Sequence, residues 1–285
     1  MTTVKGVTRR AARRVADRFG HRTAGRRALP TMLIAGGQRC GTTTLYKALS
    51  EHPSFVGPTL RKGVHYFDLN FDKSLDWYRA HFPTRSSVEA VQHRTGDPVV
   101  VGESSPYYMW HPLAPDRIVR TLPGVRVVVL LRDPVERAYS AHAHELARGF
   151  EVEPFERALE LEPERLAGQE AGLESGTLAH SKAHQHLAYV RRGEYITQLE
   201  RLAAALGRDN LLVLDSADFW AEPEQNWPAV TAFLGLSDHP VTLAQHNARS
   251  RAPMSEALRT QLEEHYAPFD ERLERWWDRT PSWRR

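Results

Sequence analysis

The amino-acid sequence predicts a single α/β domain, built as a doubly wound parallel sheet with helices on both faces. Three short apolar runs support this prediction, namely residues 31–36 (TMLIAG), 125–131 (VRVVVLL) and 210–214 (NLLVL). Apolar runs without polar alternation are typical of parallel strands that are covered on both faces. Segments with helical spacing separate the runs, and this alternation favours the doubly wound class.

The individual elements follow from local patterns. The strand at 31–36 ends in glycine, and a helix is expected over 42–50 because Leu45 and Leu49 stand at i and i+4. Pro134 favours a helix start, so a helix is expected over 135–148. In chain order, the further elements that we expect are a strand at 99–101, the strand at 125–131, a helical or mobile insertion at 151–180, a long helix over 195–206, the strand at 210–214 and a helix around 230–234.

The composition is that of a soluble globular protein, with 41% hydrophobic and 26% charged residues among 285. Cys40 is the only cysteine, which excludes an intramolecular disulfide and a cysteine-rich zinc site. A thiol-poor chain suits a reducing compartment, so a cytoplasmic protein is expected. No apolar run approaches the ~18 residues of a membrane-spanning helix, and no transmembrane segment is expected.

Basic residues are concentrated near the N-terminus. Residues 1–30 hold nine Lys or Arg and one acid, Asp17, which leaves 29 of the 38 basic and 34 of the 35 acidic residues for the rest. We expect a basic arm over 1–30 and a domain over 31–285. No apolar stretch follows the charges, which argues against a secretory signal. The arm is either a nucleic-acid or membrane contact or a solvated, partly helical leader. No basic–aromatic interleaving follows Pro30, so no nucleic-acid function is expected for the whole protein.

A glycine-rich turn, GGQRCGTTT at residues 36–44, joins the first predicted strand to the first helix. Glycines let successive N–H groups point at one anion, and the positive end of the following helix adds to the attraction. Thr42 occupies the position of the P-loop lysine, and the nearest cation is Arg39, inside the turn. The pattern predicts an anion site in a P-loop-like fold, without the lysine that triphosphatases use. Alternatively, the threonines only cap the helix.

Three blocks resemble one family. The segment GGQRCGTTTLYKALSEHP resembles the 5′-phosphosulfate loop of sulfotransferases that use 3′-phosphoadenosine 5′-phosphosulfate (PAPS), in the branch of the heparan sulfate sulfotransferases and their bacterial relatives. Residues 64–68 (VHYFD) resemble the family's acceptor-side motif, usually Glu-x-His-Phe-Phe-Asp. Residues 131–140 (LRDPVERAYS) resemble its 3′-phosphate motif, and residues 249–251 resemble a late basic loop. The blocks occur in the family's order across residues 31–255.

The resemblance implies roles on the donor side. Arg39 stands where the family usually has Lys, and a fixed cation there stabilises charge on the leaving phosphate without giving up its proton. Arg132 and Ser140 would hold the 3′-phosphate. Alternatively, Arg132 forms a salt bridge with Asp133 or Glu136. The other donor contacts that the resemblance implies are Cys40, Gly41, Thr42, Thr43, Thr44, Arg249, Ser250 and Arg251.

Two departures from the family pattern affect the catalytic base. Gly63 stands where relatives often have Glu, and Ser104 stands where many have an active-site Lys. We expect His65 to act as the base, because neutral imidazole accepts a proton near neutral pH. Asp68 or Glu103 would orient His65 or replace it.

On the acceptor side, Lys62 is expected to help hold the sulfonate, next to His65. Tyr107 and Trp110 are the candidates for an acceptor wall, and their alternative is a place in the core. His180, His184 and His186 have spacing that metal ligands also use. Sulfuryl transfer of this type needs no metal, so none is expected.

The sequence therefore predicts transfer of a sulfuryl group from PAPS to a hydroxyl or amine, with release of 3′-phosphoadenosine 5′-phosphate (PAP). The resemblance implies a small molecule, a glycan or a secondary metabolite as the acceptor. The mildly acidic body favours a small or glycosylated acceptor over a heparan-like polymer. Two alternatives remain, a P-loop kinase or nucleoside triphosphatase and a catalytically inactive PAPS-binding relative. Gly63 and Ser104 are the residues that favour the inactive relative.

Overall fold

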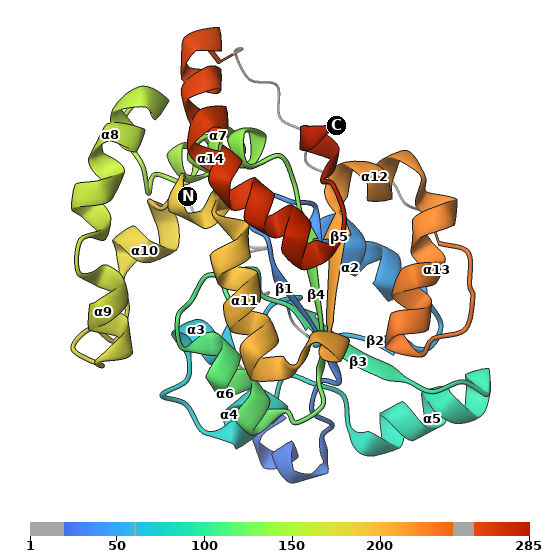
Figure 1. Ribbon diagram of the computed structural model, residues 1–285. Coiled ribbons are helices and arrows are strands. Elements are labelled where there is room, and N and C mark those ends of the chain that lie inside the picture. The colour runs from blue at the N-terminus through green and yellow to red at the C-terminus, as the bar shows by residue number, and fades with distance from the viewer. Residues whose placement is uncertain (1–19, 60, 242–253) are drawn as a thin grey trace, which may run out of the picture.

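A computed structural model describes residues 20–59, 61–241 and 254–285 of the chain. Within these ranges, five parallel strands form one sheet in the order β2-β3-β1-β4-β5 (Figure 1). The strands are β1 (Met32–Gly36), β2 (Phe55–Val56), β3 (Val100–Ser104), β4 (Arg126–Leu131) and β5 (Leu211–Asp215). The predicted doubly wound α/β class is confirmed.

Helices connect the strands and cover the sheet. The α-helices are α2 (Thr42–Glu51), α3 (Tyr66–Leu69), α4 (Leu75–Arg79), α5 (Arg85–Thr95), α6 (Ala114–Thr121), α7 (Pro134–Ala147), α8 (Phe155–Leu166), α9 (Gln169–Glu174), α10 (Lys182–His186), α11 (Tyr195–Leu206), α12 (Ser216–Ala221), α13 (Pro223–Leu234) and α14 (Glu256–Trp277). The 3₁₀ turns are η1 (Ala24–Arg26), η2 (Arg191–Gly193), η3 (Arg208–Asn210) and η4 (Ser282–Arg284).

The apolar runs of the strands supply both faces of the sheet. Successive side chains of a strand point to opposite faces. In β4, Val127 and Val129 therefore pack into the cluster that contains residues of α6, α11 and α14, whereas Val128 and Leu130 pack against α2 and α13. These three valines and the leucine are all completely buried. This two-sided burial explains why β4 reads as a continuous apolar run.

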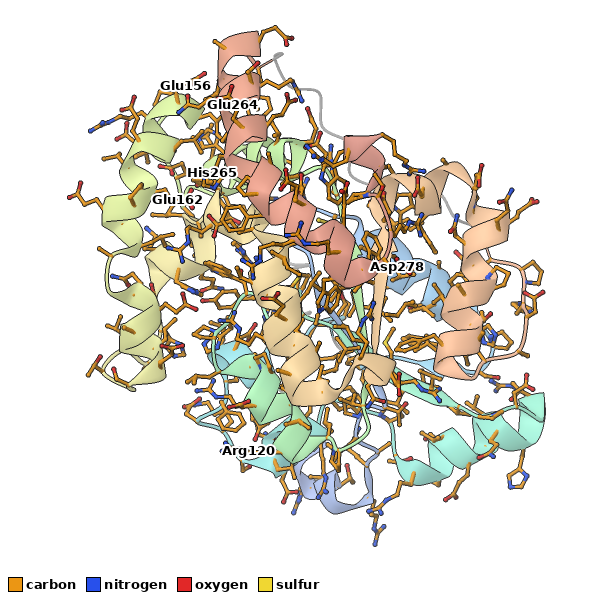
Figure 2. All side chains as sticks on the ribbon, viewed as in Figure 1. Arg120, Glu156, Glu162, Glu264, His265 and Asp278 are labelled. Carbon is orange, nitrogen blue, oxygen red and sulfur yellow. The ribbon has the colours of Figure 1, made fainter. Side chains whose placement is uncertain are left out.

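The segment over residues 151–180 is helical. It contains α8 and α9, which lie beside α10 at one side of the domain (Figure 1). The buried carboxylate of Glu162, which Figure 2 labels on α8, accepts three backbone N–H groups at 2.8–2.9 Å. These groups belong to the consecutive residues 189–191. Glu162 therefore fastens α8 to the chain that leads into η2 and α11.

The ordered contacts begin before residue 31. Gly20 approaches Ala80, and the Arg27 guanidinium donates to Thr23 and to the carbonyl oxygen of Phe82. Residues 20–30, which are part of the predicted basic arm, therefore pack against the segment after α4. In the described ranges, no helix has the length and apolar character required to cross a bilayer.

Candidate active site

The five strands are parallel, so their carboxyl ends lie at the same edge of the sheet. The chain continues from β1 to one side, through β2 and β3, and then crosses to the other side for β4 and β5. The strand order therefore reverses between β1 and β4. In doubly wound sheets, ligands bind outside the carboxyl ends of the strands at this reversal. The glycine-rich turn follows β1 and Arg132 follows β4, so both predicted phosphate motifs lie at this point.

The turn after β1 leads directly into the ten-residue helix α2. Gly41 precedes the helix with a left-handed φ of 93°, and a Cβ there would lie 2.9 Å from Nε1 of Trp220. Glycine is therefore required for both conformation and space. The first N–H groups of a helix lack partners within it, so those of Thr42 and Thr43 are available to an anion. The N–H of Thr44 donates to Gly41 instead, at 2.9 Å, which leaves Thr44 only its hydroxyl for this purpose.

Cys40 faces inward and supports the turn. Its side chain is buried, its N–H donates to Gly37 at 3.2 Å, and its carbonyl oxygen accepts the Ser216 hydroxyl at 2.9 Å. Burial raises the pKa of the thiol. The Trp220 indole donates to the same Ser216 oxygen at 3.1 Å. The structure thus gives Cys40 no role in contacting a donor, contrary to the sequence expectation, and places α12 behind the turn.

Gln38 fixes the turn from the opposite side. Its side-chain oxygen accepts from Arg192 at 2.8 Å, and its side-chain nitrogen donates to Glu145 at 3.1 Å. Glu145 also accepts from His186 at 3.1 Å. Arg192 is buried, and burial lowers its pKa to about 10. Sequence patterns did not identify this network, because its members come from four separate elements.

The residues predicted at the two phosphate positions are linked. Nε of Arg39 donates to the Ser140 hydroxyl on α7 at 3.1 Å. Arg132 forms a 3.7 Å ion pair with Glu136, which is the alternative role predicted for Arg132. Both side chains of that pair are about one-third exposed, and an ion pair of this kind contributes only about 0–1 kcal/mol. Arg132 therefore remains available to a phosphate.

A C-terminal segment supports the same region from behind. The buried carboxylate of Asp215, at the end of β5, accepts the Ser282 N–H at 2.7 Å and the Ser282 hydroxyl at 2.9 Å. The Trp283 indole donates to Asp270 at 2.9 Å and meets the Tyr195 ring edge-on. The Tyr195 hydroxyl in turn donates to the carbonyl oxygen of Arg132 at 2.7 Å. Residues 282–283 therefore contact both Asp215 and the residue that holds the backbone of Arg132.

His65 and Asp68 form a hydrogen-bonded pair. Nδ1 of His65 lies 2.8 Å from Oδ2 of Asp68, and the other Asp68 oxygen accepts the N–H of Leu69 at 2.6 Å. Burial lowers the pKa of His65, but the hydrogen bond and the negative charge of Asp68 outweigh burial and raise it overall. An ionised carboxylate only accepts hydrogen bonds, so the Nδ1 atom carries the proton. In neutral His65, Nε2 is therefore the atom with a free lone pair.

Arg39 and His65 share an unusual backbone conformation. Their φ angles are 70° and 55°, and in the described ranges Asp278 is the only other non-glycine residue with a positive φ. Such conformations cost about 1–3 kcal/mol each and cluster at functional sites. Two of the residues with predicted catalytic roles thus carry local strain that packing must offset.

Glu103 is a structural carboxylate. Its side chain is completely buried and accepts four hydrogen bonds. The donors are the Tyr78 hydroxyl at 2.6 Å, the Tyr108 hydroxyl at 3.0 Å, the Ser105 hydroxyl at 2.8 Å and the Val64 N–H at 2.7 Å. Burial raises the pKa of Glu103, and the four donors oppose that shift. The carboxylate holds the segment next to His65 and has no exposed atom with which to replace it as a base.

The segment over residues 62–65 lies along the end of β3. Besides the bond to Glu103, the Ser104 N–H donates to the carbonyl oxygen of Lys62 at 2.8 Å, and the His65 N–H donates to the Ser105 hydroxyl at 3.1 Å. The Lys62 ammonium reaches the Thr43 hydroxyl in the first turn of α2, at 2.7 Å. The structure thus brings Lys62 and His65 together with the phosphate loop.

Tyr107 and Trp110 do not form an exposed wall. Each is 5% exposed, and both pack with Ala188 in a small core cluster. The Tyr107 hydroxyl contacts Nδ1 of His184 at 2.8 Å, and the Trp110 indole donates to the carbonyl oxygen of His184 at 2.9 Å. The expectation of an acceptor wall is wrong for these two side chains. They are core residues that position α10.

Two further expectations concern residues elsewhere. Arg249, Ser250 and Arg251 lie outside the described residues. Among the residues that are described, no group of three or more His, Cys, Asp or Glu is arranged to hold a metal ion. His184 of the predicted histidine group is instead buried and stacked on Trp110.

Comparison with known proteins gives matches over most of the domain. The family described as the sulfotransferase domain matches residues 29–278. The human "Bifunctional heparan sulfate N-deacetylase/N-sulfotransferase 1" is 30% identical over 223 residues, which are 75% of this chain and 23% of that protein. The mouse "Bifunctional heparan sulfate N-deacetylase/N-sulfotransferase 4" is 29% identical over 216 residues, which are 74% of this chain and 23% of that protein. The chain thus spans less than a quarter of the length of these relatives.

A solved structure is also similar. The sulfotransferase from Alicyclobacillus acidocaldarius has a TM-score of 0.67 and 26% sequence identity to this chain. The similarity covers 90% of this chain and all of that one.

Proposed function

The chain belongs to the sulfotransferase domain family, and on this basis we propose that it transfers a sulfuryl group from PAPS to a hydroxyl or amine and releases PAP. The acceptor class that we propose is a small molecule, a glycan or a secondary metabolite. The relatives that act on heparan sulfate support a glycan in particular. PAPS is the donor substrate, and it supplies an activated sulfur–oxygen bond.

The bond between Arg39 and Ser140 is the observation that carries this proposal. A donor with phosphates at both the 5′ and 3′ positions requires two adjacent anion sites. The N-terminus of α2 can hold the first phosphate through the N–H groups of Thr42 and Thr43. Ser140 and the guanidinium of Arg132 can hold the second. The direct contact of a loop residue with Ser140 means that the two sites adjoin.

The residues divide the chemistry between them. Nε2 of His65 takes the proton of the acceptor hydroxyl while the acceptor oxygen forms its bond to sulfur. The bond from sulfur to the bridging oxygen breaks, and its electron pair remains on the phosphate of the departing PAP. Arg39 and the loop N–H groups stabilise that negative charge. Asp68 holds the tautomer and orientation of His65.

The arrangement of His65 and Asp68 favours an active enzyme over an inactive PAPS-binding relative. Gly63 and Ser104 lack the functional groups that relatives often have at these positions. However, the histidine–carboxylate pair supplies a base with a defined proton-accepting atom. A purely binding protein would have no need to maintain this pair beside a strained backbone.

Calorimetric titration tests the proposed function. The wild-type chain should bind PAP without a metal and more tightly than adenosine 5′-monophosphate (AMP) or magnesium-ATP. Arg132→Ala should lose about tenfold or more in PAP affinity, because a hydrogen bond to a charged group contributes about 1.5–3 kcal/mol. Preference for magnesium-ATP would instead support the kinase alternative. An acceptor screen with labelled PAPS then separates a transferase from an inactive relative.

A cytoplasmic location is a further proposal, supported by the single, buried cysteine. Fractionation of cells that produce the protein, followed by detection with an antibody, tests it. Recovery in the membrane fraction would contradict it.

A further inference from the structure

Gly63 permits an unusually close approach between two backbone segments. A Cβ atom at position 63 would lie 2.4 Å from the carbonyl oxygen of Ser104 and 3.1 Å from the Ser105 hydroxyl. The first distance is too short for any side chain, so a carboxylate at this position would require a different backbone. Glycine at position 63 therefore has a structural role of its own. It lets the segment over residues 62–65 lie directly against the end of β3.

This approach fixes the residues on both sides of Gly63. Before it, the carbonyl oxygen of Lys62 accepts the Ser104 N–H, and after it, the N–H groups of Val64 and His65 donate to side chains at the end of β3. The backbone of Lys62 is thus held within hydrogen-bonding distance of a strand of the central sheet. A long lysine side chain that starts from a fixed backbone loses less conformational freedom when its ammonium is bound.

The Lys62 side chain then extends to the phosphate loop. Its ammonium lies 2.7 Å from the Thr43 hydroxyl, and partial burial lowers the pKa of Lys62 to about 8. Thr43 lies in the first turn of α2, where the donor's 5′ group is expected. His65 follows three residues after Lys62, and the positive charge of Lys62 acts on it. The ammonium therefore contacts the phosphate loop, and its charge acts on the proposed base.

We propose that Lys62 binds the oxygens of the sulfuryl group while it passes from donor to acceptor, and that Gly63 is required because it lets Lys62 reach this position. The inference rests on the proposed function and names the side chain that acts on the group being transferred. Three sulfuryl oxygens carry the negative charge of that group, and an ammonium can donate to them without changing its own protonation. Lys62 thus provides charge and N–H donors, while the proton goes to His65 and the electron pair leaves with PAP.

The alternative is that Lys62 only stabilises the phosphate loop through its hydrogen bond to the Thr43 hydroxyl. The two roles differ in what they predict for PAP and PAPS, because PAP lacks the sulfuryl group. A contact with that group affects PAPS alone. Stabilisation of the loop affects the affinities for both nucleotides equally.

The experiment compares the affinities for PAPS and PAP by calorimetry, and the rate of sulfuryl transfer from labelled PAPS to water. In Lys62→Met, we expect PAPS affinity to fall about 10–100-fold while PAP affinity stays within about threefold. The transfer rate should fall by about 10²-fold or more. Lys62→Arg keeps the charge and should retain a measurable part of both properties. Lys47→Met, an exposed lysine on α2, is the matched control and should behave as wild type.

Gly63→Ala provides a second test through the backbone. It should reproduce the selective loss of PAPS affinity, because the added methyl group separates the segment from Ser104. Equal losses of PAP and PAPS affinity in Lys62→Met would overturn the inference, as would wild-type PAPS affinity and transfer rate in that variant. In both cases the proposed function survives if the wild type binds PAP and transfers sulfuryl groups. If the wild type does neither, the proposed function itself is wrong.

Discussion

Nε of Arg39 donates to the hydroxyl oxygen of Ser140 across 3.1 Å, joining the loop after β1 to the middle of α7. Ser140 is 6% exposed, so this contact occurs where water is scarce. The Ser140 oxygen accepts from Arg39, and its hydrogen remains able to donate to an anion. One hydroxyl can therefore contact both Arg39, the proposed catalytic cation, and the 3′-phosphate of the proposed donor.

Ser140→Ala should selectively weaken binding of nucleotides that carry a 3′-phosphate. We expect PAP affinity to fall about tenfold or more, and the affinity for AMP to stay within about twofold. Titration calorimetry with both nucleotides measures the difference. Ser50→Ala, which removes an exposed hydroxyl from α2, should change neither affinity. Equal losses for PAP and AMP would mean that Ser140 acts only through the shape of the loop.

The rate of sulfuryl transfer should depend on the protonation of His65. Burial lowers the pKa of His65, but the hydrogen bond and the negative charge of Asp68 outweigh burial and raise this pKa above its usual value of about 6.5. Because only the neutral form accepts a proton, activity should fall as the pH drops through this raised pKa. His65→Ala should lower kcat by about 10²–10⁴-fold while PAP affinity is retained. His93→Ala, an exposed histidine on α5, is the control.

Asp68→Asn should shift the pH at which activity falls on the acidic side of the pH–rate profile, called here the acidic limb. Loss of the carboxylate charge lowers the pKa of His65, so the limb should shift to lower pH. The maximal rate should also fall, because Nδ1 loses the partner that fixes the ring. Initial rates between about pH 5 and 9, with an acceptor identified by screening, measure both effects. A limb at the same pH in Asp68→Asn and wild type would contradict the assignment of His65.

Glu103→Gln should destabilise the fold. The carboxylate accepts from four donors, and an amide NH₂ in place of one oxygen would direct a donor at other donors. We expect the free energy of unfolding to fall by about 1–3 kcal/mol, measured by urea denaturation. Glu89→Gln on the exposed side of α5 is the matched control. Unchanged stability together with a large loss of kcat would instead identify Glu103 as a catalytic residue.

Ser282→Ala should weaken donor binding from a distance. The substitution removes one of the two bonds from Ser282 to Asp215, next to the helix that supports the phosphate loop. We expect a loss of about 0.5–1.5 kcal/mol in stability and a modest decrease in PAP affinity. Thermal unfolding with and without PAP measures both. The neighbouring exposed residue supplies the control variant Thr280→Ala, which should leave both unchanged.

Most strands of this fold could be predicted from the sequence because each is marked by a local run of apolar residues. The run predicted at 125–131 corresponds to β4, and the run at 210–214 to β5, each within one residue. The two-residue strand β2 gave no such pattern, since a short edge strand needs few apolar side chains. The order of the strands also required the structure, because it depends on pairing between distant segments.

The site was only partly readable for the same reason. The motifs predict site roles for Arg39, His65 and Arg132, but they could not show that the Lys62 ammonium reaches Thr43. The sequence predicts an acceptor contact for Tyr107 because it follows the segment that contains Glu103. Its hydroxyl instead contacts His184 on α10, 77 residues further along the chain, and this packing places Tyr107 in the core. Contacts between residues distant in sequence are the part that local patterns do not encode.

The attachment of Ser282 to Asp215 has a consequence for biosynthesis. The phosphate loop emerges early from the ribosome, whereas the residue that completes its rear support is made more than two hundred positions later. Domains fold as units during synthesis, N-terminal parts first. A nascent chain that has not yet exposed residue 282 would therefore carry the loop without its full support. Complete donor binding should appear only late in translation, so unfinished chains would sequester little PAPS.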